Sequence, residues 1–375
     1  MESFDVLIIG GGPAGTMTGI ELRKKGYKTC IIDKEAFPRE KLCGGLLTQK
    51  SVDLITRHCP GLDPSDFVVE QSDTVDFFYQ GEKINRFRTK RVYYFTERTI
   101  FDDLLIRYYL ELGGKLLQQV PLKIDDIHFR KSTLTTGSST YNYKYLVGAD
   151  GCNSVLCKAA RIKRHDFLCV KGKISRDLRQ EKELRIYFNV AKRGYGWYFP
   201  RKEYYCVGMG GEESGKKICY RAKRFFREEF DQQVLQIKGA FLPSGRKLNT
   251  RRLPKNTIPV GDAAGFTDPV TGEGLYFAML SGILAAGAID ASAKSQNKNV
   301  IGLYNKNVLP IWKNIRAARF WKSVLFFSPF LKTFMKHLKT HTSFALFYLE
   351  RVIATGEFDY TNFLKVYFLK IRSIH

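Results

Sequence analysis

The chain has 375 residues, of which 44% are hydrophobic and 26% are charged. This composition is typical of a soluble globular protein with two domains or with one large α/β unit. The formal net charge of +24 would attract polyanions, but the basic residues are spread along the whole sequence, without zinc-finger spacing or an RNP-like motif. We therefore exclude nucleic acid as the partner.

The eight cysteines form no CxxC pair and no Cys/His cluster with the spacing of metal ligands, so we expect reduced thiols and no metal site. The N-terminus enters an apolar strand directly and lacks the basic region and cleavage site of a signal peptide. These features predict a cytoplasmic protein. The longest uncharged run, residues 274–289, has 16 residues. Because ~18–20 apolar residues are needed to span a bilayer, we expect a packed helix there.

The first 34 residues have the pattern strand, glycine turn, helix and second strand. The apolar run 6–9 predicts a buried parallel strand, and residues 29–32 predict the next one, which ends at Asp33. Between them lies a GxGxxG motif formed by Gly10, Gly12 and Gly15. The first glycine makes the tight turn, the second lets a pyrophosphate approach the backbone, and the third lets the helix pack on the strand. We therefore predict a dinucleotide site, with Asp33 at the ribose hydroxyls.

Two later segments repeat this chemistry. The run "YKYLVGADGCNS" predicts a strand that leads to Asp150 and Gly151. The run "NTIPVGDAAGFTDPVTGEG" predicts a strand that leads to Gly261 and Asp262, followed by a loop with Gly272 and Gly274. A carboxylate at a strand end can bind sugar hydroxyls, and a glycine-rich helix start can bind phosphate or a flavin edge. Either segment alone is also compatible with an ordinary strand-to-helix turn.

Aromatic, alternating segments predict a second, antiparallel sheet. One set lies between residues 70 and 95, with Gly81 near a hairpin turn, and a second set comprises "ELRIYFNV", "GYGWYFP" and "YYCVGMG". Because side chains alternate along a strand, Tyr195, Trp197 and Phe199 share one face. They would form either an aromatic wall around an apolar substrate or a stripe of the core.

The C-terminal quarter is basic and rich in aromatic residues. Residues 311–375 contain eleven Lys and Arg but three acids, and residues 360–371 carry an apolar stripe at helical spacing. The stripe comprises Tyr360, Phe363, Leu364, Tyr367, Phe368 and Ile371. A basic amphipathic helix of this kind can cover a sheet or lie in a membrane interface, so peripheral membrane contact stays open here.

The three motifs "GGGPAG", "GADGCNS" and "VGDAAGFTDPVTGEG" together resemble the FAD-binding motifs of para-hydroxybenzoate hydroxylase-like flavoproteins, over residues 1–290. The pair "PREKLCGG" and "YGWYFP" further resembles the geranylgeranyl reductase family, which saturates double bonds of isoprenoid chains. The resemblance implies FAD as the cofactor. The resemblance also implies which residues bind FAD, namely Gly10, Gly12, Pro13, Ala14, Gly15, Asp33, Lys34, Arg39, Cys43, Gly44, Gly45, Arg98, Asp150, Gly151, Gly261, Asp262, Gly272 and Gly274.

The resemblance also implies the reaction and its residues. Tyr195, Trp197 and Phe199 would line the substrate channel, and Cys43 and Lys41 would act in catalysis beside the flavin ring. A thiol there could position the flavin or relay a proton, and Lys41 or Arg39 would favour its thiolate. Gly44 and Gly45 would let the backbone approach the ring. Without the resemblance, Cys43 would be a small buried cysteine beside a turn. The alternative for Arg98 is an ion pair with Asp102 or Asp103.

We therefore predict an α/β protein with a Rossmann-like FAD-binding domain, an antiparallel β-sheet substrate domain and a helical C-terminal region. The predicted boundaries are 1–70, 96–160 and 250–300 for the FAD domain, 71–95 and 161–249 for the substrate domain, and 301–375 for the helical cap.

The predicted function is reduction of C=C bonds in an isoprenoid or other lipophilic substrate, with electrons from NAD(P)H, ferredoxin or another donor. The alternative is a flavin-dependent monooxygenase, followed by a halogenase. Halogenases typically carry WxWxIP where this chain has YGWYFP, which argues against the halogenase.

Overall fold

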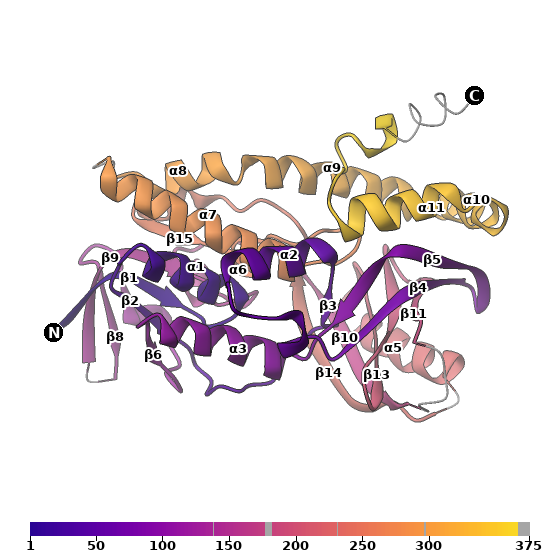
Figure 1. Cartoon of the computed structure of the whole chain (residues 1–375), viewed down its shortest axis with the longest axis horizontal. Helices are drawn as coiled ribbons and strands as arrows, with labels where there is room; N and C mark the ends of the chain where they lie inside the picture. Colours follow the sequence, from indigo (N-terminus) through magenta and orange to yellow (C-terminus); the bar gives the residue numbers. More distant parts are fainter. Residues whose placement is uncertain (138, 177–181, 231, 296–297, 367–375) are drawn as a thin grey trace.

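The computed structural model describes residues 1–137, 139–176, 182–230, 232–295 and 298–366. The chain forms two β-sheets that lie next to each other, and a layer of helices extends over both of them (Figure 1). This architecture confirms the predicted α/β class with a second sheet and a helical C-terminal region.

The first sheet contains the predicted nucleotide-binding strands. Parallel pairs join β1 to β2, β1 to β9, and β9 to β15, so the carboxyl ends of these strands meet at one edge of the sheet. Val6, Leu7 and Ile8 of β1 are fully buried because side chains cover both faces of the sheet. The strands, in spatial order, are β6 (Lys115–Leu117), β2 (Thr29–Ile32), β1 (Glu2–Ile9), β9 (Ser139–Gly148), β8 (Thr133–Thr136) and β7 (Ile127–His128), with β15 (Thr257–Pro259) also beside β9.

Small residues let the helices α1 (Pro13–Lys24) and α7 (Leu275–Lys294) pack closely on this sheet. A Cβ atom at Gly282 would lie 2.3 Å from the carbonyl oxygen of Ala14, so only glycine fits there. By length and hydropathy α7 is the one helix among the described residues that could cross a membrane, but 61% of its apolar window is buried in the protein. The remaining helices around the sheet are α2 (Gln49–His58), α3 (Arg98–Glu111), α4 (Val155–Ala159) and α6 (Gly261–Ala264).

The second sheet is antiparallel except for one parallel pair, β11 with β4. Helix α5 (Gly215–Glu229) covers one face, and the C-terminal helices cover the other. The predicted hairpin turn at Gly81 is present, with φ of +79°. The strands, in spatial order, are β14 (Leu235–Pro243), β10 (Asp166–Ser175), β13 (Tyr204–Gly210), β12 (Gly194–Pro200), β11 (Leu184–Ala191), β4 (Glu70–Tyr79), β5 (Glu82–Phe95) and β3 (Leu46–Leu47).

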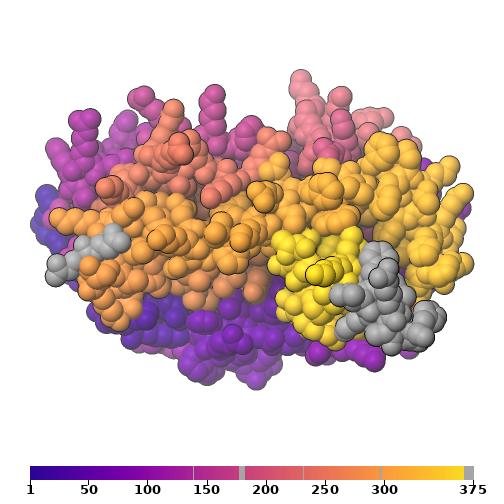
Figure 2. Space-filling model, turned by 90° about the horizontal axis from the view of Figure 1, so that it is seen from above, coloured from indigo at the N-terminus to yellow at the C-terminus, as the bar shows by residue number. Residues whose placement is uncertain are grey.

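The C-terminal helices cover one broad side of the molecule, as Figure 2 shows from above. Tyr360 and Phe363 of the predicted stripe are buried against α9, and Leu364 packs beside them, so this part of the stripe faces the protein. Tyr367, Phe368 and Ile371 lie outside the described residues. The elements are α8 (Val300–Asn307), α9 (Leu309–Leu325), α10 (Ser328–Thr340), α11 (Ser343–Phe347) and the π-helix η4 (Tyr348–Ala354).

The strands of the two sheets alternate along the chain. The first sheet uses strands within residues 2–32, 115–148 and 257–259, and the second uses strands within 46–47, 70–95 and 166–243. An FAD domain made from discontinuous segments remains our interpretation of this alternation, with the boundaries given above.

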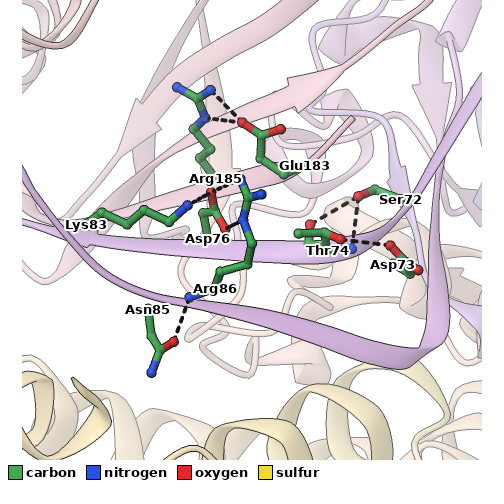
Figure 3. A network of polar contacts seen from close by, with 9 residues as sticks. All are labelled: Ser72, Asp73, Thr74, Asp76, Lys83, Asn85, Arg86, Glu183 and Arg185. Carbon is green, nitrogen blue, oxygen red and sulfur yellow. Dashed lines mark hydrogen bonds and ion pairs between the residues drawn. The ribbon is translucent and has the colours of Figure 1, made fainter. Parts of the chain in front are cut away.

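A buried carboxylate on β4 of the second sheet binds two cations of the neighbouring strand β5 (Figure 3). Asp76 on β4 is 1% exposed and lies opposite Arg86 on β5 and Arg185 on β11. Its oxygen atoms accept two hydrogen bonds from the Arg86 guanidinium at 2.9 Å and one from Lys83 Nζ at 2.6 Å. Burial alone would raise the pKa of Asp76, but the hydrogen bonds from Arg86 and Lys83 hold it below its ordinary value.

We expect Asp76→Asn to lower the free energy of unfolding by about 1–3 kcal/mol at pH 7, because the two cations lose their buried partner. A lowered pKa in the folded state means that the ionised pair stabilises the protein above the unfolded carboxyl pKa of about 3.9. The difference in the free energy of unfolding between the wild type and Asp76→Asn should therefore shrink as the pH falls below about 4. Urea unfolding at pH 7 and pH 3 measures this difference, and Asp73→Asn, at an exposed position of the same strand, is the control. A difference that does not change with pH would contradict an ionic origin.

Candidate functional site

A cavity of about 1030 Å³ begins at the carboxyl edge of the first sheet and continues between the second sheet and the C-terminal helices. The predicted site residues that line it are Gly10, Gly12, Pro13, Ala14, Asp33, Lys34, Arg39, Lys41, Cys43, Gly44, Gly45, Arg98, Asp150, Gly151, Tyr195, Trp197, Phe199, Asp262, Gly272 and Gly274. Gly15 and Gly261 do not line it. The cavity therefore brings segments from the whole length of the sequence together at one place.

The glycines of the first motif differ in what requires them. A Cβ atom at Gly15 would lie 2.0 Å from the carbonyl oxygen of Gly10, and one at Gly10 would lie 2.4 Å from that of Ala149. A Cβ atom at Gly261 would lie 2.8 Å from the Cβ atom of Ala14. Packing therefore explains these three glycines. Gly12 differs, because its Cβ atom would enter the cavity, 3.6 Å from Arg39 Nη2.

Three carboxylates follow strands at this edge of the sheet. Asp33 accepts hydrogen bonds from the backbone N–H groups of Gly11 at 2.7 Å and Glu35 at 3.0 Å, so it also fixes the glycine turn. Asp150 Oδ2 accepts from Val155 N at 2.6 Å, whereas Oδ1 is buried and has no partner among the described residues. Burial raises the pKa of both Asp150 and Asp262. A ligand with hydroxyl groups would supply the missing donors.

Arg98 forms the ion pair with Asp102, and its contact with the cofactor stays a prediction. Its guanidinium donates two hydrogen bonds of 2.6 Å to Asp102, which is fully buried, and it also lines the cavity. Arg39 Nη1 lies 3.2 Å from the same carboxylate, and the Arg39 guanidinium stacks over the ring of Phe37. These contacts hold both guanidinium groups in place opposite Gly12.

Cys43 is half-buried in the cavity wall. Its Sγ atom accepts a hydrogen bond from Gly45 N at 3.3 Å, and its carbonyl oxygen accepts one from Lys171 Nζ at 3.2 Å. Burial opposes the charge on Arg98, but Asp102 and then Cys43 hold the pKa of Arg98 above its ordinary value. The Arg98 guanidinium therefore interacts with the thiol. That Lys41 or Arg39 favours the thiolate of Cys43 stays a prediction.

The two glycines after Cys43 are required by protein contacts. Gly45 has φ of +68°, and a Cβ atom there would lie 2.2 Å from the carbonyl oxygen of Thr96. A Cβ atom at Gly44 would lie 3.1 Å from the ring of Phe199. Arg201, which is 2% exposed, donates to the carbonyl oxygen of Gly44. The sequence analysis missed Arg201, although it directly follows "YGWYFP".

The three aromatic residues of β12 line the cavity and also belong to the core of the second sheet. Consecutive ring centroids of Tyr195, Trp197 and Phe199 are 6.3 Å apart. The Tyr195 hydroxyl donates to the carbonyl oxygen of Thr271 and so connects this wall to the loop before α7. The indole N–H of Trp197 is buried and has no partner among the described residues.

The far half of the cavity is apolar, and the C-terminal helices supply one of its walls. The sequence analysis did not identify the residues of this wall as part of the site, because apolar side chains at helical spacing look the same in a core and in a cavity wall. They include Leu325, Phe326, Phe330, Phe334, Leu338, Ala345, Leu349, Tyr360 and Phe363. The opposite wall includes Val75, Phe77, Leu184, Ile186 and Phe188 of the second sheet.

Comparison with known proteins identifies this architecture. A family model described as an FAD binding domain matches residues 3–59. A digeranylgeranylglycerophospholipid reductase of Methanococcus vannielii is 27% identical over 324 residues, which cover 79% of each chain. A geranylgeranyl bacteriochlorophyll reductase-like protein from Thermoplasma acidophilum has a structure with a TM-score of 0.78 and 22% identity, covering 91% of this chain and 92% of its own. The chain is therefore an FAD-binding flavoprotein that is similar to geranylgeranyl reductases over about four fifths of its length.

This flavoprotein shares its fold with enzymes of different chemistry. A probable FAD-dependent monooxygenase from Pseudomonas aeruginosa superposes with a TM-score of 0.65 and 14% identity, covering 89% of this chain and all of its own. The residues of the cavity fit FAD, the cofactor of the family. The space at Gly12 admits a pyrophosphate, and the unpartnered oxygen of Asp150 can accept a hydrogen bond from a hydroxyl.

We expect Gly12→Ala to weaken FAD binding at least tenfold while the protein stays folded, because its φ of −75° suits alanine and its Cβ atom would occupy the cofactor cradle. Gly15→Ala is the matched comparison. It should destabilise the fold itself, because its Cβ atom would overlap the Gly10 carbonyl oxygen. FAD content from the flavin absorbance and the melting temperature of each apoprotein separate the two effects. A Gly12→Ala protein with normal FAD affinity would contradict the expectation that the cofactor lies against Gly12.

Proposed function

We propose that this flavoprotein reduces isolated C=C bonds in the isoprenoid chain of a lipophilic substrate. One observation carries the proposal. The cofactor cradle, which is the space beside Gly12, Arg39 and Arg98, opens directly into an apolar chamber, which is the far half of the same cavity of about 1030 Å³. A prenyl chain is a long, flexible hydrocarbon, and burying it in such a chamber removes apolar surface from water. The names of the relatives, which are reductases of geranylgeranyl groups, support the same substrate class.

The chemistry requires a hydride for one alkene carbon and a proton for the other. Reduced FAD, when bound, supplies the hydride. We propose that Cys43 Sγ delivers the proton, because it lies in the wall where the cradle meets the chamber. Gly45 N–H and the Arg98 guanidinium adjoin Sγ and would stabilise the thiolate that the transfer leaves. Tyr195, Trp197 and Phe199 would hold the chain and exclude water.

Lys41 takes a different part in this proposal. Its Nζ atom would lie 3.9 Å from a Cβ atom at Gly151, and its charge acts on the carboxylate of Asp262. We therefore assign Lys41 to the cofactor side of the cavity, where it would balance the charge of that buried carboxylate. Its catalytic role beside Cys43 stays a prediction.

A lipophilic substrate of this class would be collected from a membrane surface. We propose that the junction of α9 and α10 makes this contact. Phe320, Phe327 and Phe330 are exposed there by 62%, 62% and 44%. Lys332 and Lys336 follow on the exposed side of α10. Aromatic side chains near lysines suit the interface of an anionic bilayer.

One anaerobic turnover separates the reductase from the monooxygenase. We expect the photoreduced holoprotein, mixed with a polyprenyl lipid without oxygen, to form a product that has gained two hydrogen atoms while the flavin is reoxidised. Mass spectrometry and the flavin spectrum measure both. If the flavin stays reduced until air is admitted and the product then gains an oxygen atom, the monooxygenase is correct.

We expect Cys43→Ala to slow product formation by about 10²–10⁴-fold, the usual contribution of a positioned proton donor, with FAD content unchanged. Cys219→Ala, which removes an exposed thiol on α5, is the control and should react normally. The rate of flavin reoxidation in single turnover is the readout. A Cys43→Ala enzyme as fast as the wild type would assign the proton to another group.

A further inference from the structure

Two thiols share the wall of the large cavity. The chain has eight cysteines, and all of them lie within the described residues. Among them, only Cys43 and Cys169 line the cavity. Both are partly exposed, whereas five of the other six are buried and Cys219 lies on the outside of α5. The proposed reaction uses Cys43 and gives Cys169 no part. The cavity therefore presents two thiols to any small molecule that enters it.

Strand β10 carries Cys169 toward the loop of Cys43. Side chains two positions apart point to the same side of a strand, so Cys169 and Lys171 share one face of β10. Lys171 Nζ donates a hydrogen bond of 3.2 Å to the carbonyl oxygen of Cys43. A disulfide can form only where two Cβ atoms can approach each other. The hydrogen bond from Lys171 holds the Cys43 loop over the part of β10 that contains Cys169.

Small residues flank Cys169 on both neighbouring strands. Its partners across the sheet are Gly210 of β13 and Ala240 of β14, and both line the cavity. A Cβ atom at Gly210 would lie 2.4 Å from Cys169 Sγ, so the sulfur atom leans over the backbone of β13. Strand β12 follows β13 in the sheet, and there a Cβ atom at Gly44 would lie 3.1 Å from the ring of Phe199. Cys169 Sγ therefore leans toward the side of the sheet where the loop of Cys43 lies.

The charges near the two thiols give them different reactivity. The Arg98 guanidinium interacts with the Cys43 thiol, and a cation beside a thiol favours the reactive thiolate. Burial raises the pKa of Cys169 to about 12, the charge of Lys322 opposes this rise, and the charge of Cys43 adds to it. The two sulfur atoms thus lie within electrostatic reach of each other. Cys43 is the thiol that an oxidant meets as a thiolate, and Cys169 stays protonated until Cys43 has reacted.

We propose that Cys43 and Cys169 are a redox pair that hydrogen peroxide converts into a disulfide. In the first step the Cys43 thiolate attacks one oxygen atom of the peroxide, and the O–O bond breaks. Cys43 becomes a sulfenic acid, and the other oxygen leaves as hydroxide, which takes up a proton to form water. In the second step the Cys169 sulfur attacks Cys43 Sγ, the S–O bond breaks, and the hydroxyl group leaves as water with the Cys169 proton. The two thiols lose two electrons in total, and the peroxide gains them.

The disulfide would have two consequences for the site. It would protect Cys43 from further oxidation to a sulfinic acid, which thiols cannot reverse. It would also withdraw the proton that the proposed function assigns to Cys43, so the enzyme would stay inactive until a thiol reductant opens the bond. Only this second consequence rests on the proposed function, because the pair itself follows from the positions and charges of the two thiols.

Peptide mapping of the oxidised holoprotein tests the pair. The protein is treated with an equimolar amount of hydrogen peroxide, and its free thiols are alkylated under denaturing conditions and mapped by mass spectrometry. We expect the thiols of Cys43 and Cys169 to disappear together. The two peptides should appear as a linked pair whose mass is their sum less two hydrogen atoms, and dithiothreitol should restore both thiols.

A variant without the second thiol separates a pair from a single reactive cysteine. Cys169→Ala places a smaller side chain between Gly210 and Ala240, so the protein should fold and keep its flavin absorbance. We expect Cys43 to stop at the sulfenic acid in this variant, so that labelling by dimedone rises about fivefold or more over the wild type. Cys206→Ala, which removes a buried thiol from the neighbouring strand β13, is the matched control and should form the wild-type disulfide.

Three results would overturn the pair. They are a wild-type protein in which Cys43 is oxidised while Cys169 stays fully alkylated, a bond from Cys43 to a different cysteine, and equal dimedone labelling in the wild type and Cys169→Ala. The readout is the mass of two peptides and needs no turnover. An enzyme that fails to reduce alkenes would therefore refute the proposed function and leave this result intact.

Discussion

The loop of residues 43–45 is held by positive charge from the second sheet, and the shape of the cavity depends on it. Lys171 of β10 binds the carbonyl oxygen of Cys43, and Arg201 binds that of Gly44. Arg201 is itself held by its hydrogen bond to the carbonyl oxygen of Pro200 and by the ring of Phe95. Buried guanidinium groups are costly unless they are bonded, so this geometry has few alternatives. The wall between cofactor cradle and substrate chamber therefore has one defined position.

Sequence patterns predicted the parts of the site where chemistry demands a residue type. A glycine turn, a carboxylate after a strand and three alternating aromatic residues are recognisable because few other residues satisfy those geometries. Strand β2 was located to the residue, and residues as distant as Gly12, Asp150 and Gly274 were grouped correctly around one cavity.

Other parts could not be read from the sequence. Asp33 was expected to face a ribose, and its two backbone hydrogen bonds depend on how the turn folds back on the strand. The contact of Arg201 with the carbonyl oxygen of Gly44 leaves no local signal, because the two residues are 157 positions apart in the sequence. The same holds for the chamber wall on α9 and α10, since apolar residues there are compatible with any core. In each of these examples the role of the residue depends on contacts with residues that are distant in the sequence. A local sequence pattern carries no signal for such contacts.

The common fold leaves the chemistry to the cavity. Reductase-like and monooxygenase-like proteins share this fold, so the fold cannot distinguish their chemistry. In this protein the cavity has apolar walls and a thiol among its lining residues. A chamber with walls of this kind selects for shape and hydrophobicity, which discriminate weakly between chains of similar length. Polar contacts at the ends of the substrate must supply the remaining selectivity.

The π-helix η4 and the helices before it close the chamber with a segment that follows all the described strands in the chain. Every strand of both sheets, and every glycine of the cradle, precedes residue 275. During translation, the cofactor site can therefore assemble while the chamber still lacks a wall. An apolar trough left open in this way would attract other hydrophobic surfaces. Because FAD binds the folded protein, early occupation of the cradle would favour correct closure of the chamber.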